Sequence, residues 1–456
     1  MRNNNLRSSP LSGLKSEHFK TLRLAIPIAA AQVGQLVVQI VDNAMVGRLG
    51  ATPLAGVAFG GNVFFFLFIF GLGLAMGITP LVGELYSQGR HRSSAQILQN
   101  SLALYLGIGV VISALQFLTV PLFQYMGQPA EVLEAGTPYY EYLAWSSIPL
   151  MMFFALRSFL EGIGNTRVAM TITIISNVVN IVFNYLLIYG EFGFPAMGAA
   201  GAGLSTLISR ILMPIMLLGY FAWHQSFRRY LSFYARANWS RRQVGTLLAL
   251  GFPISLQMTL EGGAFAITGI MMGWLGTEAL AANQIAILVC NMAFLIVLSI
   301  GSATTIRVSH EYGARNFAAI RRISRSSYII GIVWNVFMAT IFITCRNVLP
   351  RIFTVDQAVI DVTGGLLIMV AVFQVFDGLQ STSLCILRGM QDVKATSVIA
   401  FISYIVINLP VGYLFAFTLG VGPQGLWIGF VFGLATAAAL LIYRYRKIVA
   451  RYERGA

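Results

Sequence analysis

Three carboxylic acids, Asp42, Glu261 and Asp377, stand inside long apolar stretches of the sequence. Placing a charged side chain at the centre of a bilayer costs about 2.5–3.5 kcal/mol even on the more lenient insertion scale. Such a group therefore pairs with another group, faces water or serves a function. A carboxylate can take up H⁺, and its hard oxygens can also coordinate Na⁺. The three acids are accordingly our candidates for binding a cation within a membrane.

Each acid also has a structural interpretation. Asp42 lies six residues before Arg48, near the end of its apolar run, and the two side chains are spaced to form a local ion pair. Glu261 and Asp377 have no nearby base in the sequence, so a structural role would require a partner on another helix. Arg210 is the one base deep inside an apolar run. We expect it to form an internal salt bridge that holds its helix, rather than to bind a ligand.

The composition predicts an all-α polytopic membrane protein. The chain has 456 residues, of which 57% are hydrophobic and 10% are charged, and its mean hydropathy is +0.76. Soluble domains are about 25% charged. A chain this apolar needs lipid to cover part of its surface, and its apolar runs are continuous rather than alternating, which excludes a transmembrane barrel.

Several other classes of function are disfavoured by the same sequence. The net charge of +14 is spread over short clusters between apolar runs, so it does not indicate a nucleic-acid-binding domain. The three cysteines lie in apolar stretches without metal-ligand spacing. All four histidines fall in loops or near the N-terminus. We therefore expect no cofactor, no tightly bound metal and no intramembrane enzyme active site.

About twelve apolar runs are long enough to cross a bilayer, which takes about 20 residues. We place them near residues 22–47, 54–82, 96–124, 138–161, 167–190, 196–223, 243–274, 279–306, 320–345, 359–387, 395–418 and 423–444. The longest polar interval after the N-terminus divides them into two sets of six. The expected parts are a cytoplasmic N-terminal segment (1–21), an N-terminal six-helix lobe (22–223), a cytoplasmic loop (224–242), a C-terminal six-helix lobe (243–444) and a basic cytoplasmic tail (445–456).

Basic residues gather on one side of the predicted membrane. Of the 30 Lys and Arg residues, Arg48, Arg346 and Arg351 alone fall in loops of the opposite side, and Arg210 lies inside a span. In this count, Arg388 belongs to the side of the membrane that has more Lys and Arg residues. Because cytoplasmic loops carry the excess of Lys and Arg, we expect both termini in the cytoplasm and the chain in the cell inner membrane.

The two halves of the chain are related in sequence. Pro27 and Pro253 stand in similar contexts, LAIPIAAAQ and LGFPISLQ, at an offset of 226 residues. Since each half has an even number of spans, both halves enter the membrane from the same side and form parallel repeats, as in transporters that rock two bundles around a midplane site. The two prolines predict matching kinks in the first and seventh spans. The same offset relates Glu261 to Gln35, so this acid is not part of the shared scaffold.

Several motifs resemble those of the MATE family, the multidrug and toxic compound extrusion transporters. They are VDNAMVGRLGATPLAGVA at 41–58, VGELYSQG at 82–89, EGIGNTR at 161–167, NYLLIYG at 184–190, VSHEYGARN at 308–316 and LRGMQD at 387–392. They cover nearly the whole chain in the family's order. The resemblance is to the NorM-like branch, because Asn184 stands where the DinF-like branch usually has a fifth-span aspartate.

The resemblance implies a secondary active exporter with two six-helix lobes and a central cavity. It would exchange cytoplasmic amphipathic organic compounds, often cations and drugs, for inward-moving Na⁺ or H⁺ by rocker-switch alternating access. We expect the chain to act as a monomer in membrane lipid, with no nucleic acid partner and no cofactor besides the coupling ion. A flippase of a lipid-linked precursor is the alternative, but it would need several cations in its cavity, and only Arg210 lies deep in a span.

The resemblance also assigns roles to individual residues. Glu261 in the seventh span and Asp377 in the tenth stand at the family's cation-coupling positions, where a transported Na⁺ would bind, and Asp42 matches its first-span acid. The residues that we expect to line the cavity are Gln35, Asn177, Asn180, Phe265 and Phe376.

Overall fold

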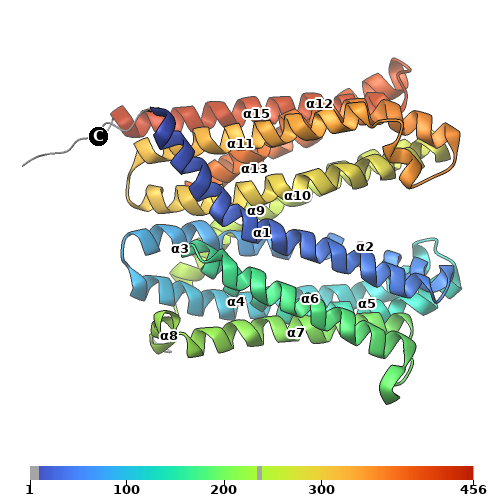
Figure 1. Ribbon diagram of the computed structural model, residues 1–456, viewed down its shortest axis with the longest axis horizontal. Coiled ribbons are helices and arrows are strands. Elements are labelled where there is room, and N and C mark those ends of the chain that lie inside the picture. Colours follow the sequence, from blue (N-terminus) through green and yellow to red (C-terminus); the bar gives the residue numbers. More distant parts are fainter. Residues whose placement is uncertain (1–9, 234–238, 455–456) are drawn as a thin grey trace, which may run out of the picture. The chain divides into compact units, whose positions relative to one another are not determined.

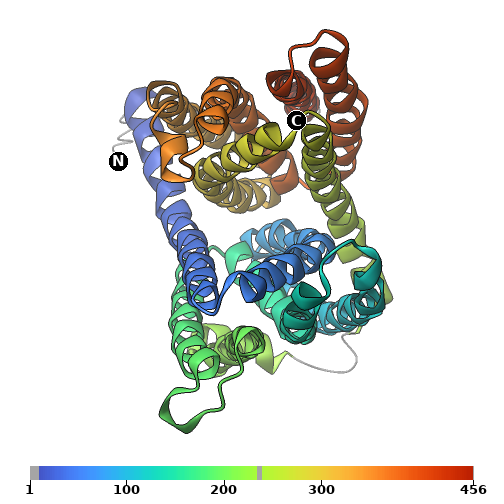
Figure 2. The ribbon, with the colours of Figure 1, turned by 90° about the vertical axis from the view of Figure 1, so that its right-hand side faces the viewer.

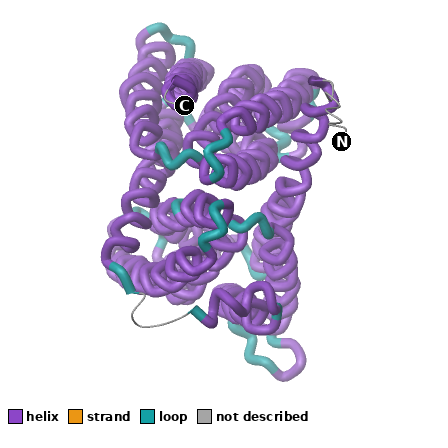
Figure 3. Tube along the Cα trace, turned by 90° about the vertical axis from the view of Figure 1, so that its left-hand side faces the viewer, coloured by secondary structure: helices purple, strands orange, loops and turns teal. Residues whose placement is uncertain are grey.

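The computed structural model describes residues 10–233 and 239–454, and these residues form helices joined by loops, with no strand among them (Figure 3). The first half contains α1 (Pro10–Gly47), α2 (Ala51–Met76), α3 (Ile78–Ser87), α4 (His91–Thr119), η1 (Val120–Tyr125), α5 (Ala130–Gly162), α6 (Thr166–Tyr189), η2 (Glu191–Gly193), α7 (Ala199–Trp223) and α8 (Gln225–Ser232). The second half contains α9 (Arg241–Trp274), α10 (Thr277–Gly313), α11 (Phe317–Thr344), η4 (Leu349–Ile352), α12 (Gln357–Gly389), α13 (Val393–Ala400), the π-helices η5 (Phe401–Asn408) and η6 (Leu414–Thr418) on either side of α14 (Leu409–Tyr413), and α15 (Pro423–Arg454).

Twelve stretches of the described helices are long and apolar enough to cross a membrane. Most are single helices, whereas α2 and α3 together make the second span, α4 and η1 make the third, and the segment from α13 to η6 makes the eleventh. The predicted all-α polytopic fold is therefore confirmed.

The chain forms two compact units whose limits differ from the lobes expected from the sequence. The C-terminal unit comprises Met1–Ala29 together with Leu256–Ala456, and the N-terminal unit comprises Ala30–Ser255. The expected lobes, 22–223 and 243–444, instead divided the chain at the polar loop. The difference arises because the first part of α1 packs with helices of the second half, and the first part of α9 packs with helices of the first half.

The limits of the two units follow the internal repeat. Ala29 and Ser255, where the units change within α1 and α9, are related by the same offset of 226 residues as Pro27 and Pro253. Each proline lies inside a continuous helix, two residues before the change. The first helix of each repeat therefore passes from one compact unit to the other at an equivalent position.

Helix α5 is central to the N-terminal unit, where it packs against α2, α4 and α7, while α6 packs on α7 (Figures 1 and 2). Small residues allow these helices to approach closely. A Cβ atom added to Gly56 of α2 would lie 2.8 Å from the backbone nitrogen of Gly136 of α5. Glycine is therefore required at this crossing.

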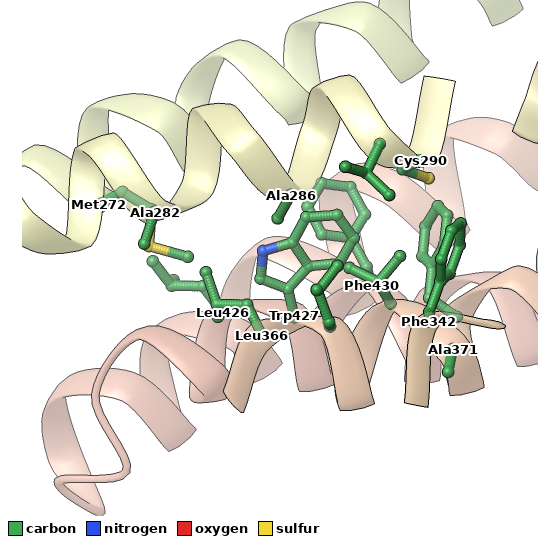
Figure 4. Packing of buried hydrophobic residues seen from close by; sticks show 14 of the residues in the cluster. Met272, Ala282, Ala286, Cys290, Phe342, Leu366, Ala371, Leu426, Trp427 and Phe430 are labelled. Atoms are coloured by element: carbon green, nitrogen blue, oxygen red, sulfur yellow. The ribbon is translucent and has the colours of Figure 1, made fainter. Parts of the chain in front are cut away.

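In the C-terminal unit, α12 packs against α10, α11 and α15. Their apolar side chains form a cluster around Trp427 and Phe430 of α15, into which α10 contributes Ala282, Ala286 and Cys290 (Figure 4). The indole nitrogen of Trp427 donates a hydrogen bond to the side-chain oxygen of Asn283 at 3.0 Å, which satisfies its one polar group inside the core. This core holds α12, which carries one of the predicted site acids.

Candidate functional site

Glu261 of α9 and Asp377 of α12 both belong to the C-terminal unit and lie close enough to interact electrostatically. The amide nitrogen of Gln257, one turn before Glu261, donates to the Glu261 carboxylate at 2.8 Å. In turn, the Arg388 guanidinium donates to the Gln257 oxygen at 3.2 Å. Glu261 is thus linked to a buried positive charge through an amide.

Asp377 is held differently from Glu261. It is 3% exposed, and its Oδ2 atom has no hydrogen-bond partner among the described residues. Tyr404, nearly fully buried on the π-helix η5, interacts electrostatically with both acids. Single-turn π-bulges occur often at functional sites. A buried carboxylate oxygen without a donor leaves a place for a cation or a proton.

A second row of polar side chains lies behind Asp377. Gln374 donates to the Asn335 oxygen at 3.2 Å and accepts from the Cys290 thiol at 3.5 Å. A Cβ atom on Gly378 would lie 1.6 Å from the Asn335 amide nitrogen. Glycine at position 378 therefore makes the room that Asn335 occupies.

Sequence reasoning missed Gln257, Arg388 and Tyr404. Arg388 was counted as a loop base, but it belongs to the last turn of α12 and is 7% exposed, so that assignment was wrong. Gln257 precedes Glu261 by four residues, which places the two on one helix face. That spacing is a signal that could have been used, whereas nothing in its local sequence distinguishes Tyr404.

In the N-terminal unit, Asp42 of α1 lies at the end of a chain of hydrogen bonds that joins amides and hydroxyls. Asn184 of α6 donates to the Asp42 carboxylate and also to the Asn180 oxygen, the latter at 3.2 Å. Asn180 donates to the Thr206 hydroxyl at 3.3 Å, and Ser205 donates to the Asn184 oxygen. The predicted site residues Asp42 and Asn180 thus belong to one network, in which Asn184 is the central member.

The two ion pairs considered for this half are not found in the described residues. Asp42 makes no salt bridge with Arg48. Nor does Arg210 form the expected internal salt bridge: its Nη1 atom donates to the Ser146 hydroxyl at 2.7 Å, and its guanidinium lies over the Phe64 ring at 4.9 Å. The expectation for Arg210 was wrong because its neighbours on α5 and α2 are a hydroxyl and an aromatic ring.

The remaining predicted cavity residues lie in separate places. The amide nitrogen of Asn177 has no hydrogen-bond partner among the described residues, and it would lie 3.1 Å from a Cβ on Gly34. Gln35 is half-buried on α1. Phe265 stacks on Phe430 at 4.4 Å, and Phe376 also packs against the apolar core of the C-terminal unit. The structure therefore joins Asp42 with Asn180, and Glu261 with Asp377, whereas the two phenylalanines border the core.

Comparison with protein families gives a match in both halves of the chain. The sequence model of the MatE family matches residues 27–186 and 253–414, which begin at the repeat-related prolines. A probable multidrug resistance protein NorM of Bradyrhizobium diazoefficiens is 34% identical over 455 residues, covering 97% of each chain. The multidrug resistance protein NorM of Photobacterium profundum is 32% identical over 438 residues, covering 95% of this chain and 96% of the relative.

Two solved structures show the same fold at low sequence identity. The Vibrio cholerae MATE transporter VcmN in its bent form has a TM-score of 0.87 at 18% identity, covering 97% of this chain and 99% of that one. The eukaryotic MATE transporter AtDTX14 has a TM-score of 0.84 at 21% identity, again covering 97% and 99%. Fold and sequence therefore agree over nearly the whole length.

Proposed function

Because this chain belongs to the MatE family of multi-pass membrane transporters, we propose that it exports amphipathic organic compounds, often cationic, in exchange for inward-moving Na⁺ or H⁺. The observation that carries this proposal is the full-length similarity to relatives described as multidrug resistance proteins. The chain is a transporter and not an enzyme. Its substrates are accordingly small organic molecules, which it does not modify.

Glu261 and Asp377 are the proposed coupling site. Two carboxylates in a dry environment repel each other when both are charged, and one bound H⁺ or Na⁺ relieves that repulsion. The unpartnered Oδ2 atom of Asp377 and the hydroxyl of Tyr404 supply hard oxygen atoms for such an ion. Each positive charge that moves inward across 100 mV contributes about 2.3 kcal/mol. The coupling ion thus delivers enough energy to drive export.

In the proposed cycle, the two six-helix lobes rock to expose the substrate site alternately to the two sides. The compound enters from the cytoplasm or the inner leaflet while the acids are free of the coupling ion. Cation binding at Glu261 and Asp377 then weakens the hold on the substrate and returns the carrier to its inward state. Asp42, in its network with Asn184 and Asn180, contributes to coupling or to substrate binding from the N-terminal unit. We place the chain as a monomer in the inner membrane, with both termini cytoplasmic.

Dye export by the purified protein in vesicles tests this function. Vesicles loaded with a fluorescent cation receive an imposed Na⁺ or H⁺ gradient, and wild-type protein should release the dye under at least one of them. Glu261→Gln and Asp377→Asn should insert normally and lose gradient-driven release. Glu278→Gln, at an exposed acid in the first turn of α10, should not. Wild-type rates in both site variants would refute the coupling assignment, and no release by wild-type protein would refute the function.

A further inference from the structure

A polar pocket of about 250 Å³ lies in the C-terminal unit, where the start of α1 meets the end of α10 and the start of α11. Three bases and two acids line it, namely Lys20, Arg307, Arg322, Glu17 and Glu311. The proposed coupling acids, Glu261 and Asp377, are not among its lining residues. The pocket therefore needs an explanation that is separate from ion coupling.

Two of the lining charges neutralise each other. The Arg307 guanidinium forms an ion pair with the Glu17 carboxylate, and it also donates to the Glu17 carbonyl oxygen at 2.9 Å. The Lys20 ammonium lies 3.6 Å from a Glu17 oxygen as well, but its side chain is 58% exposed. Because Arg307 already compensates the charge of Glu17, the charge of Lys20 is available to a ligand.

Arg322 and Glu311 form no ion pair in the part of the chain that the structure describes. Arg322 is exposed in the second turn of α11, whereas Glu311 is half-buried near the end of α10. With the lining His310 neutral, three bases and two acids leave the pocket with a net charge of +1. That charge matches a ligand that carries one negative charge.

The position of the pocket along α1 matches the headgroup layer of a membrane. The apolar run of α1 begins at Leu22, and Phe19, Leu22 and Ile26 are exposed apolar side chains on one face of the helix. Glu17 precedes Leu22 by five residues, which is about 7.5 Å along a helix. The headgroup layer is about 5–7.5 Å thick on each side of the hydrocarbon core. The pocket therefore lies at the depth of the lipid phosphates.

We infer that this pocket binds the phosphodiester of an anionic phospholipid, with Lys20 and Arg322 as its charged donors. Basic pockets between membrane helices bind lipid headgroups, and a guanidinium can hold two phosphate oxygens at once. A phosphatidylglycerol headgroup carries one negative charge, which balances the pocket, whereas a zwitterionic headgroup leaves the pocket charge uncompensated. The inference goes beyond the proposed function, because it concerns neither the exported compound nor the coupling ion.

Native mass spectrometry of the purified full-length protein in detergent tests this assignment. The probes are dioleoylphosphatidylglycerol and dioleoylphosphatidylcholine, which have the same acyl chains and differ in headgroup charge. Wild-type protein should bind the first phosphatidylglycerol about fivefold more tightly than the first phosphatidylcholine, the factor for one charge near a membrane surface. Phosphatidylglycerol should also raise the melting temperature, because a bound ligand stabilises the folded state and this one joins α1 to α11.

Three variants separate this pocket from the general charge of the surface. Arg322→Gln makes the pocket neutral, so the preference for phosphatidylglycerol should disappear. Glu311→Gln removes an acid, so the preference should increase to about 25-fold, a gain that misfolding cannot produce. Arg325→Gln is the matched control, because it removes an exposed base one turn further along α11 that does not line the pocket. It should keep the wild-type preference.

Several results would overturn the assignment. They are equal affinity of wild-type protein for the two lipids, an unchanged preference in Arg322→Gln or in Glu311→Gln, and a loss in Arg325→Gln as large as that in Arg322→Gln. Inorganic phosphate has the same charged oxygens without acyl chains, and in excess it should leave the melting temperature unchanged. A rise as large as that produced by phosphatidylglycerol would show a site for free phosphate instead of a lipid.

Discussion

The two units hold their acidic side chains in different ways. Asp42 accepts a hydrogen bond from the Asn184 amide, a neutral donor that is itself bound by Asn180 and Ser205. Asp377 has a carboxylate oxygen with no donor among the described residues and shares its surroundings with Glu261. A hydrogen-bond donor stabilises a charged carboxylate, whereas a buried carboxylate oxygen without a donor favours a neutral or cation-bound form. We therefore propose that the two acids act at different steps of the transport cycle.

We predict that Asp42 acts without Arg48. Asp42→Asn should abolish dye export while the melting temperature in detergent falls by little, because the amide still fits the network. Arg48→Gln should change neither quantity. A double-mutant cycle on melting temperature should give a coupling energy below about 0.5 kcal/mol, as for independent sites. Recovery of stability in the double variant would show that the two form an ion pair and would remove Asp42 from the transport site.

At the scale of elements, residues at equivalent repeat positions near the starts of α1 and α9 form different kinds of contact with neighbouring helices. Gln243 of α9 accepts a hydrogen bond from the Asn100 amide at 2.8 Å within the N-terminal unit. Its repeat equivalent, Glu17 of α1, forms an ion pair with Arg307 of α10 within the C-terminal unit. Arg307 also donates to the Thr21 hydroxyl at 2.6 Å. The start of α9 is thus held by a hydrogen bond between two amides, and the start of α1 is held by an ion pair.

The ion pair of α1 should contribute measurably to stability. The side chains of Arg307 and Glu17 are 11% and 13% exposed. Glu17→Gln should therefore cost about 1.5–3 kcal/mol, the range for hydrogen bonds to charged groups, and should lower the melting temperature. Lys20 also pairs with Glu17, at 3.6 Å, but its side chain is 58% exposed, so Lys20→Gln should cost about 0.2–1 kcal/mol. Equal effects of the two substitutions would show that the Arg307 contact does not anchor α1.

The crossing of α2 and α5 gives another prediction at this scale. A Cβ atom on Gly136 would lie 2.6 Å from the carbonyl oxygen of Gly56. This oxygen belongs to the backbone, so no side-chain rotation can relieve the clash. Gly136→Ala should separate the helices and destabilise the protein by about 1–3 kcal/mol, as overpacking does. Gly107→Ala in α4 meets no atom within 4 Å and serves as the control, which should be neutral or slightly stabilising. Melting temperatures of the two variants in one detergent decide the matter, and similar values would contradict the close packing.

Elements could be predicted from the sequence far better than the contacts of the site. Long apolar runs predict helices directly, because a segment within lipid must satisfy its own backbone hydrogen bonds. The internal repeat could also be predicted, from a constant offset between matching residues. By contrast, Asn184 and Asp42 are 142 residues apart, and their hydrogen bond depends on how α6 packs. The partners of Arg210 were missed for the same reason. A sequence shows that a charge is buried, but the packed helices decide which group meets it.

At the scale of the whole molecule, the start of α1 and the end of α15 both pack on helices of the C-terminal unit. The start of α1 is bound to α10 through Arg307 and to α11 through Ser326, which is 2.7 Å from His18. Near the end of α15, Tyr452 stacks on Phe317, the first residue of α11, at 4.4 Å. An even number of spans requires the two ends to share one side of the membrane. From the excess of Lys and Arg around them, we propose that this side is cytoplasmic.

Cysteine labelling in intact cells tests this orientation. In a Cys345→Ser background, Ser87→Cys lies at the exposed end of α3 and Val348→Cys lies after α11 at a position that is 62% exposed in the native chain. The proposed orientation puts residue 87 in the cytoplasm and residue 348 outside. An impermeant maleimide should therefore label Val348→Cys at once, and should label Ser87→Cys only after the membrane is permeabilised. Cys290 and Cys385 are buried in the C-terminal unit, so the background variant alone should stay unlabelled in both conditions. The reverse pattern would invert the proposed orientation, and with it the direction in which the exported compound and the coupling cation would cross the membrane.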